Sequence, residues 1–261
     1  MTRKIKRYGW IPDLPDHRDF VYAAPPSVLR VLPPKKDLSG DCPPVYDQGE
    51  LGSCTANAIG AAHQFEQMKQ SVRTAFAPSR LFIYYNERAM EGTVSEDSGA
   101  MIRDGIKSVV KQGVCTESAW PYDIRRFALK PSKPCYAAAQ AHQVVSYRSV
   151  VQSLNQMKGC LASGYPFVFG FSVYESFESS AVARTGKVPM PGTSEKALGG
   201  HAVMAVGYDD VDERFVVRNS WGPKWGRKGY CFMPYAYLTD PHLASDFWTI
   251  RMVEAAAETR R

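Results

Sequence analysis

The sequence predicts an α+β protein in which helices come first and strands later. In the first half of the chain, apolar residues recur at the spacing of one helix face, whereas the second half carries short β-rich runs separated by Gly, Pro and Asp. This segregation argues against a parallel sheet built from alternating strands and helices. We therefore expect a helical lobe over roughly residues 48–140 and a sheet lobe over roughly residues 141–252, with a cleft between them.

The individual elements follow from the same periodicities. One helix is predicted to start just after Gly52, where Ser53 is a suitable N-cap. Other helices are expected after Pro78, from about residue 98 to Gly113, and from about residue 150 to Gly164. Strands are predicted over residues 167–174, 201–208, 215–219, 230–233 and 247–252.

Residues 1–36 form a Pro-rich stretch of different character, the N-terminal segment. Its closely spaced prolines prevent a helix, so we expect an extended chain that is partly polyproline II. Aromatic residues such as Tyr8 and Trp10 favour docking on a surface over a flexible leader. The main domain then covers residues 37–252, and residues 253–261 are expected to be a frayed tail.

Composition limits the class of protein. A chain of 261 residues can bury a sizeable core, and a hydrophobic fraction of 44% is typical of globular proteins. The net charge is +6, but much of the excess lies at the two ends, where charges are usually solvated. No nucleic-acid-binding motif accompanies it. We expect a monomer with no nucleic-acid partner and no membrane association.

We expect neither a signal peptide nor a metal-binding motif in this sequence. The stretch from Tyr8 to Asp13 interrupts any apolar core of a signal peptide, so the default expectation is a cytoplasmic protein, with leaderless secretion as the alternative. The six cysteines show no CxxC or Cys/His ligand spacing. We expect no dense disulfide framework, no metal and no cofactor.

Three short segments carry the residues that can do chemistry. In the first, Gln48 and Gly49 precede Gly52-Ser53-Cys54 at the start of a predicted helix. A thiol must ionise to attack a carbonyl, and the positive end of a helix favours the anion. The amide of Gln48 could stabilise a developing oxyanion. The second segment places His201 at the start of an apolar strand, and the third places Asn219 at the end of another.

Taken together, these motifs resemble the papain (C1) family of cysteine peptidases. The matching residues are Gln48-Gly49, Gly52-Ser53-Cys54, Gly200-His201-Ala202-Val203 and Asn219-Ser220-Trp221-Gly222. They occur in the family's order, and the N-terminal segment is similar to that of certain bacterial members. The resemblance implies a papain-like two-lobed fold, with a helical left lobe, an antiparallel β-barrel-like right lobe and the active-site cleft between them.

The resemblance also implies roles for individual residues. Cys54 would be the nucleophile of an endopeptidase that hydrolyses peptides or proteins through a thioester. His201 would act as acid and base, Asn219 would orient the histidine, and Gln48 would bind the oxyanion. Trp221 would shield the histidine–asparagine bond from water.

Candidate substrate-binding residues follow from the same resemblance. Gly99 would pair its backbone with an extended substrate. Met101, Phe167, Gly199 and Gly200 would line the pocket for the side chain two residues before the cut, and Met101 and Phe167 would make that pocket apolar.

The sequence departs from the family at several places. Leu51 stands where many members have a cysteine, so the disulfide made there is absent, and Thr55 replaces an aromatic residue. The long helical propeptide of many zymogens is replaced by the N-terminal segment. We expect part of this segment to lie across or beside the cleft, where it would restrain activity as a propeptide does.

Two alternatives remain at this stage. The chain could be a catalytically silent or autoinhibited binding protein that keeps the papain fold. It could instead be another Cys/His acyl-transfer enzyme, such as an amidase or a transglutaminase-like protein. The filled catalytic positions weigh against the first alternative, and the Gln48 spacing and the Asn219-Ser220-Trp221-Gly222 run weigh against the second.

Overall fold

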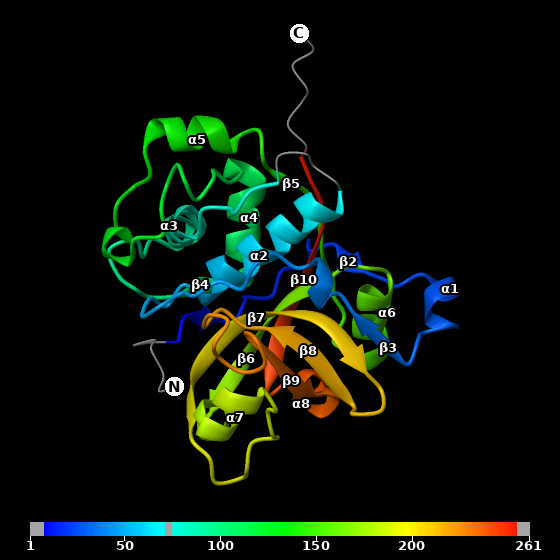
Figure 1. The fold of residues 1–261 in the computed structure, drawn as a ribbon. Coiled ribbons are helices and arrows are strands. Elements are labelled where there is room, and N and C mark those ends of the chain that lie inside the picture. The colour runs from blue at the N-terminus through cyan, green and yellow to red at the C-terminus, as the bar shows by residue number, and fades with distance from the viewer. Residues whose placement is uncertain (1–7, 71–74, 255–261) are drawn as a thin grey trace.

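The structure is a computed structural model that describes residues 8–70 and 75–254. Helices α2 (Cys54–Lys69), α3 (Arg80–Glu91) and α4 (Ile102–Gln112) lie together on one side of the molecule, and most strands lie on the other (Figure 1). The α+β class predicted from the sequence is confirmed. The shorter helices are α1 (Pro26–Leu29), α5 (Lys133–Ala139), α6 (Leu154–Ala162), α7 (Ser180–Thr185) and α8 (Tyr235–Thr239).

The main sheet runs in the order β2-β5-β10-β6-β7-β8-β9, and β3 pairs with β7. Its pairs are antiparallel except β2 with β5, which is parallel. The strands are β2 (Val21–Tyr22), β3 (Lys35–Asp37), β5 (Val144–Val150), β6 (Phe167–Tyr174), β7 (Ala197–Asp209), β8 (Arg214–Arg218), β9 (Tyr230–Pro234) and β10 (Ala244–Val253).

The expected barrel-like lobe is an open, mixed sheet. Within the described residues, the outermost strands β2 and β9 do not pair with each other. The edge strand β2 comes from the N-terminal segment and covers the free edge of β5. Covering an edge with another strand satisfies its backbone groups without closing the sheet.

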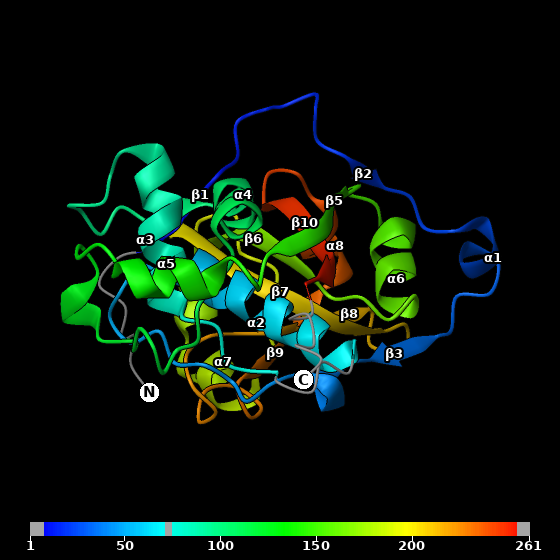
Figure 2. The same cartoon turned by 90° about the horizontal axis from the view of Figure 1, so that it is seen from above.

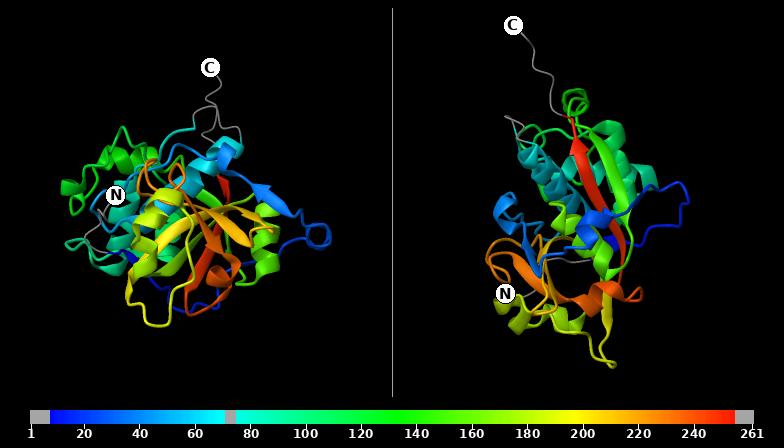
Figure 3. Two further views of the ribbon diagram at one scale, coloured as in Figure 1. Left: turned by 60° about the horizontal axis from the view of Figure 1, so that its bottom comes forward. Right: turned by 90° about the vertical axis from the view of Figure 1, so that its right-hand side faces the viewer.

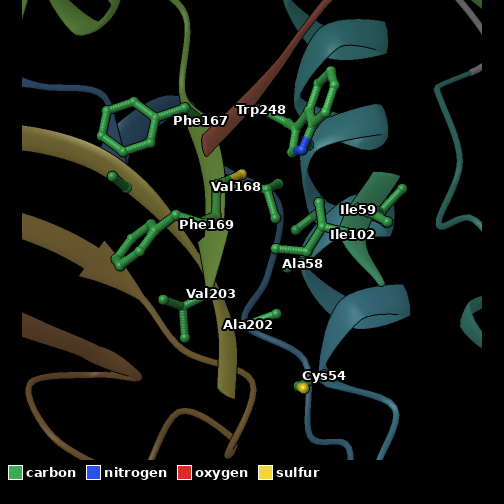
Figure 4. Close-up of a cluster of buried hydrophobic side chains, with 14 of the residues drawn as sticks. Cys54, Ala58, Ile59, Ile102, Phe167, Val168, Phe169, Ala202, Val203 and Trp248 are labelled. Carbon is green, nitrogen blue, oxygen red and sulfur yellow. The ribbon is translucent and has the colours of Figure 1, made fainter. Parts of the chain in front are cut away.

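Helix α2 is the central support of the molecule, because both lobes pack on it. Thirteen of its 16 residues are buried, so its environment is not that of a one-sided surface helix. Figure 4 shows Ala58 of this helix turned toward Val168 of the sheet, whereas Ile59 lies beside Ile102 of α4. This packing fixes the start of α2, and hence Cys54, against β7.

The N-terminal segment crosses the molecule in an extended form. Strand β1 (Trp10–Ile11) pairs in parallel with β4 (Ala100–Met101) of the helical lobe. Between β1 and β2 the chain forms an arch that stands away from the rest of the molecule (dark blue in Figure 2), and α1 follows β2. The right-hand view of Figure 3 shows the arch at one side. Across residues 8–70 and 75–254, no helix is long and apolar enough to cross a membrane.

Candidate active site

Cys54 is the first residue of α2, and its side chain is fully buried. The backbone amides of Ala202 of β7 and of Gly9 of the N-terminal segment lie close enough to the sulfur to lower the pKa of the thiol. Ser53 occupies the N-cap position, as expected, but its side chain makes no capping bond and pairs with the Tyr122 hydroxyl instead. The thiol therefore sits at an open helix N-terminus between the two lobes.

His201 lies on β7, Asn219 directly follows the neighbouring antiparallel strand β8, and the two side chains face each other. The Nε2 atom of His201 is 2.8 Å from Oδ1 of Asn219, and both side chains are buried. Because an amide oxygen can only accept, His201 must donate through Nε2–H, which leaves Nδ1 as the nitrogen that can exchange a proton. Among the described residues, Nδ1 has no hydrogen-bond partner.

Aromatic rings enclose the histidine. The ring of Trp221 lies 5.2 Å from that of His201, and Trp221 in turn packs edge-on against Trp225 and Phe177. Phe171 contacts the imidazole from β6 at 5.7 Å. The rings exclude water from the His201–Asn219 bond, which strengthens it and holds the imidazole in one orientation.

Gln48 is held by a residue that the sequence reasoning missed. Its Oε1 accepts a 2.7 Å hydrogen bond from the hydroxyl of Ser220, and its Nε2 donates to the carbonyl of Leu51 at 2.9 Å. One Nε2 hydrogen therefore remains for another acceptor. Ser220 directly follows Asn219 in the motif, and this position is the signal that could have identified it.

Burial controls the charge of the pair in this closed form. Desolvation raises the pKa of the Cys54 thiol to about 12, against the lowering effect of the nearby backbone amides. Desolvation also lowers the pKa of His201 to about 4, and the bond to Asn219 opposes this only in part. At neutral pH both groups are uncharged while the site is covered. A thiolate–imidazolium pair requires that the cleft be uncovered.

The predicted backbone-pairing residue, Gly99, contacts the N-terminal segment. The carbonyl of Gly9 accepts a 2.8 Å bond from the Ala100 amide, and a Cβ built on Gly99 would lie 2.1 Å from that carbonyl oxygen. Gly99 has a φ of +77°, which also favours glycine. Met101 pairs with Ile11 of the same segment. This edge of the cleft therefore holds an extended chain, as the sequence predicts for a substrate.

The structure places two of the predicted pocket residues, Gly199 and Gly200, beside the N-terminal segment, but it places Phe167 elsewhere. A Cβ on Gly199 would come within 2.8 Å of Tyr8, and one on Gly200 within 2.5 Å of the Trp10 ring. Phe167 does not reach this pocket, because its ring is buried in the sheet core against Phe169, Phe215 and Phe247. It pairs with Ala205 of β7, four residues along the strand from His201.

Gly170 takes the place that the sequence analysis gave to Phe167. It pairs with Ala202, next to His201, and a Cβ there would lie 1.9 Å from the indole of Trp10. A lone glycine inside an apolar strand indicates a close approach by another group, and this signal could have identified it.

Comparisons with known proteins agree with this arrangement. The family model described as papain family cysteine protease matches residues 32–240. An uncharacterized peptidase C1-like protein of Acanthamoeba polyphaga mimivirus is 51% identical over 215 residues, which cover 79% of this chain and 69% of the viral protein. A cathepsin B-like protein of Giardia intestinalis is 30% identical over 210 residues, with 72% of this chain and 63% of that protein covered.

Solved structures extend the similarity to nearly the whole chain. Xylellain, a cysteine protease from Xylella fastidiosa, is 49% identical and superposes with a TM-score of 0.89 over 97% of this chain and 99% of that chain. A digestive procathepsin L from the larval midgut of Tenebrio molitor shares the fold at 17% identity, with a TM-score of 0.70, 90% of this chain and 74% of that chain. The α+β, papain-like fold expected from the sequence is thus confirmed, and the chain belongs to the papain family of cysteine proteases.

Proposed function

We propose that the chain is a cysteine endopeptidase in which Cys54, His201, Asn219 and Gln48 perform the reaction. The observation that carries the proposal is the 2.8 Å bond between His201 and Asn219, placed beside a helix-start cysteine and under Trp221. We also propose residues 37–252 as the catalytic domain and residues 1–36 as a segment that restrains it.

The first half of the reaction forms a thioester. The Cys54 thiolate attacks the scissile carbonyl carbon, and the oxygen takes up the negative charge. The free Nε2 hydrogen of Gln48 and the backbone N–H of Cys54 stabilise that charge. His201 then gives its Nδ1 proton to the leaving nitrogen, the C–N bond breaks, and the amine departs.

The second half restores the enzyme. Neutral His201 takes a proton from water through Nδ1, and the resulting hydroxide attacks the thioester carbon. The carboxylic acid leaves, and the sulfur and the imidazolium return as an ion pair. Asn219 accepts from Nε2–H throughout, so the ring keeps Nδ1 directed to the reacting groups.

A thiol-directed epoxide tests the assignment of the nucleophile. We expect mass spectrometry of the labelled Tyr8→Ala/Trp10→Ala variant, in which the N-terminal segment is loosened, to place the adduct on Cys54, because that thiol lies at a helix N-terminus and near the backbone of Ala202, the residue after His201. Hydrolysis should be lost in proportion to labelling. Labelling of another cysteine, with hydrolysis unchanged, would contradict the proposal.

Gln48→Ala tests the oxyanion role. We expect kcat to fall about 10²–10³-fold with KM nearly unchanged, as for loss of one oxyanion donor. Ser220→Ala should lower kcat in the same direction by a smaller factor, because Gln48 then loses the partner of its Oε1 atom. The exposed Gln140→Ala variant is the control. An unchanged kcat in Gln48→Ala would remove Gln48 from the mechanism.

The contacts of the N-terminal segment support its proposed restraining role. The backbone amide of Gly9 lies close to the Cys54 sulfur, and the ring of Tyr8 lies 5.9 Å from that of His201. The hydroxyl of Tyr8 also donates to Glu178, and Trp10 fills the space left by Gly170 and Gly200. A chain in this position excludes substrate from the same atoms that would react with it.

The complete burial of Cys54 also favours a second candidate, a papain-fold protein that binds a partner without turnover. The two candidates differ in what happens when the N-terminal segment is loosened. A peptidase gains hydrolysis, whereas a silent binding protein gains none. Peptide, isopeptide and muropeptide substrates compared on that loosened form separate a peptidase from an amidase or a transglutaminase-like enzyme.

A further inference from the structure

We propose that Asp13 and Asp246 form a pH-dependent latch that holds the N-terminal segment in the cleft in acid and loosens it as the pH rises to neutral. The inference rests on the proposed restraining role of the segment. It adds a change of pH as the event that releases the segment. It also identifies the two carboxyl groups that respond, Asp13 on the segment and Asp246 on β10.

The two carboxyl groups belong to one buried hydrogen-bond network. Oδ2 of Asp246, on β10, accepts from the Trp10 indole at 2.9 Å and from the Asp13 backbone amide at 2.8 Å. In return, Oδ2 of Asp13 accepts from the Trp248 indole at 2.8 Å, and its Oδ1 accepts from the Arg103 amide at 3.0 Å. The segment is therefore tied to both β10 and α4 through these two side chains.

The backbone of β10 is shaped to present Asp246. This residue has a φ of +58°, which non-glycine residues seldom adopt. The pairing of β10 with β6 also shifts register between Ser245 and Trp248. Such a bulge re-aims a side chain, and here it turns the carboxyl group toward the segment. The strained residue would have little structural purpose if the segment were absent.

The charge of Arg103 lowers the pKa of both carboxyl groups, but it does not offset their burial. The Arg103 guanidinium pairs with Asp19 at 2.6 Å, and Lys107 lies 3.5 Å from Asp16. An adjoining cavity of about 480 Å³ lets solvent protons reach the network. The titratable and charged groups around the pair are Asp16, His17, Asp19, Arg103, Lys107 and Tyr147.

Burial and the neighbouring carboxyl group then set the direction of the pH effect. Burial, followed by the charge of Asp246, raises the pKa of Asp13 to about 7 from its ordinary value of 3.8, and burial also raises the pKa of Asp246. The docked form therefore keeps a proton that the released form loses. Docking is at full strength below about pH 4, weakens by up to about tenfold per pH unit toward pH 7, and then levels off.

Fluorine NMR of the full-length chain measures the latch directly. The Cys54→Ala variant is labelled with 5-fluorotryptophan, which gives five sites, and the Trp10 signal is assigned by Trp10→Phe. Between pH 4.5 and 8.5 we expect the docked Trp10 signal to lose intensity to a released signal as the pH rises. The signal of Trp120, in the helical lobe, reports that the fold is retained.

Two variants distinguish the latch from a general effect of pH. The Asp13→Asn/Asp246→Asn double variant keeps acceptor oxygens for Trp10 and Trp248 but cannot ionise at either position, so we expect its Trp10 signal to be independent of pH. Asp16→Asn, on the same segment, should behave like the parent chain. An unchanged Trp10 signal across the range in the parent chain, or the same pH dependence in the Asp13→Asn/Asp246→Asn variant, would overturn the latch.

These outcomes do not depend on catalysis. A chain without peptidase activity would still show the transition if the latch exists. An active peptidase would show a pH-independent Trp10 signal if the latch does not exist. Failure of the latch and failure of the proposed function are therefore separate results.

Discussion

Replacing Cys54 with alanine is expected to reduce peptide hydrolysis by at least about 10⁴-fold, the order of loss seen when a covalent nucleophile is removed. The physical reason is that no other group can form the thioester. Alanine at a fully buried position beside Ala202 leaves the neighbouring packing nearly unchanged, so folding should be retained.

The control for this variant is Cys42→Ala, because Cys42 is a half-buried free thiol away from the histidine. Both variants should show the same thermal unfolding as the parent chain, measured by circular dichroism. Hydrolysis by Cys54→Ala at more than a few per cent of the parent rate would mean that Cys54 is not the nucleophile. Loss of activity in both variants would point to damage to the fold.

Removing the two aromatic anchors of the N-terminal segment is expected to give the largest gain of activity. Tyr8 and Trp10 are 7% and 8% exposed, so their truncation removes most of the apolar contact that holds the segment over Cys54. Truncation of one buried tryptophan costs about 3–5 kcal/mol. We expect the Tyr8→Ala/Trp10→Ala double variant to raise the rate of peptide hydrolysis and of Cys54 labelling at least about 10²-fold.

The matched control lies on the same segment. Phe20 is 67% exposed on the arch, and Phe20→Ala should leave both rates unchanged. A point variant is a sharper test than deletion of residues 1–36, because deletion also removes the buried Tyr22 and strand β2 from the sheet. Equal labelling of Cys54 in the parent and the double variant would contradict the restraining role.

The helices and strands were largely predictable, because apolar residues that recur at helix or strand spacing can be recognised in a single sequence. The four predicted helices appear as α2, α3, α4 and α6, and the five predicted strands as β6 to β10. Strand β5 was missed because its residues are mostly half-buried and lack a clear alternation. Helix α5, with two prolines nearby and a run of alanines, gave no apolar stripe.

The errors in the site have one physical origin. On a strand, a shift of one residue moves a side chain to the other face, and a shift of two or three moves it along the cleft. Phe167 was therefore placed in the pocket although Gly170 lies there. The carboxyl group of Asp246 beside Trp10 could not be foreseen, because it depends on a bulge in β10.

The sequence by itself determined the family, the order of the motifs and the residue types available for chemistry. It could do so because each motif is local: a cysteine at a helix start, a histidine at a strand start and an amide at a strand end. Only the tertiary structure decided that Ser220 holds Gln48, that the sheet stays open and that Trp10 and Asp13 meet Asp246. Those contacts join residues up to 236 positions apart, and their geometry depends on how the two lobes pack on α2.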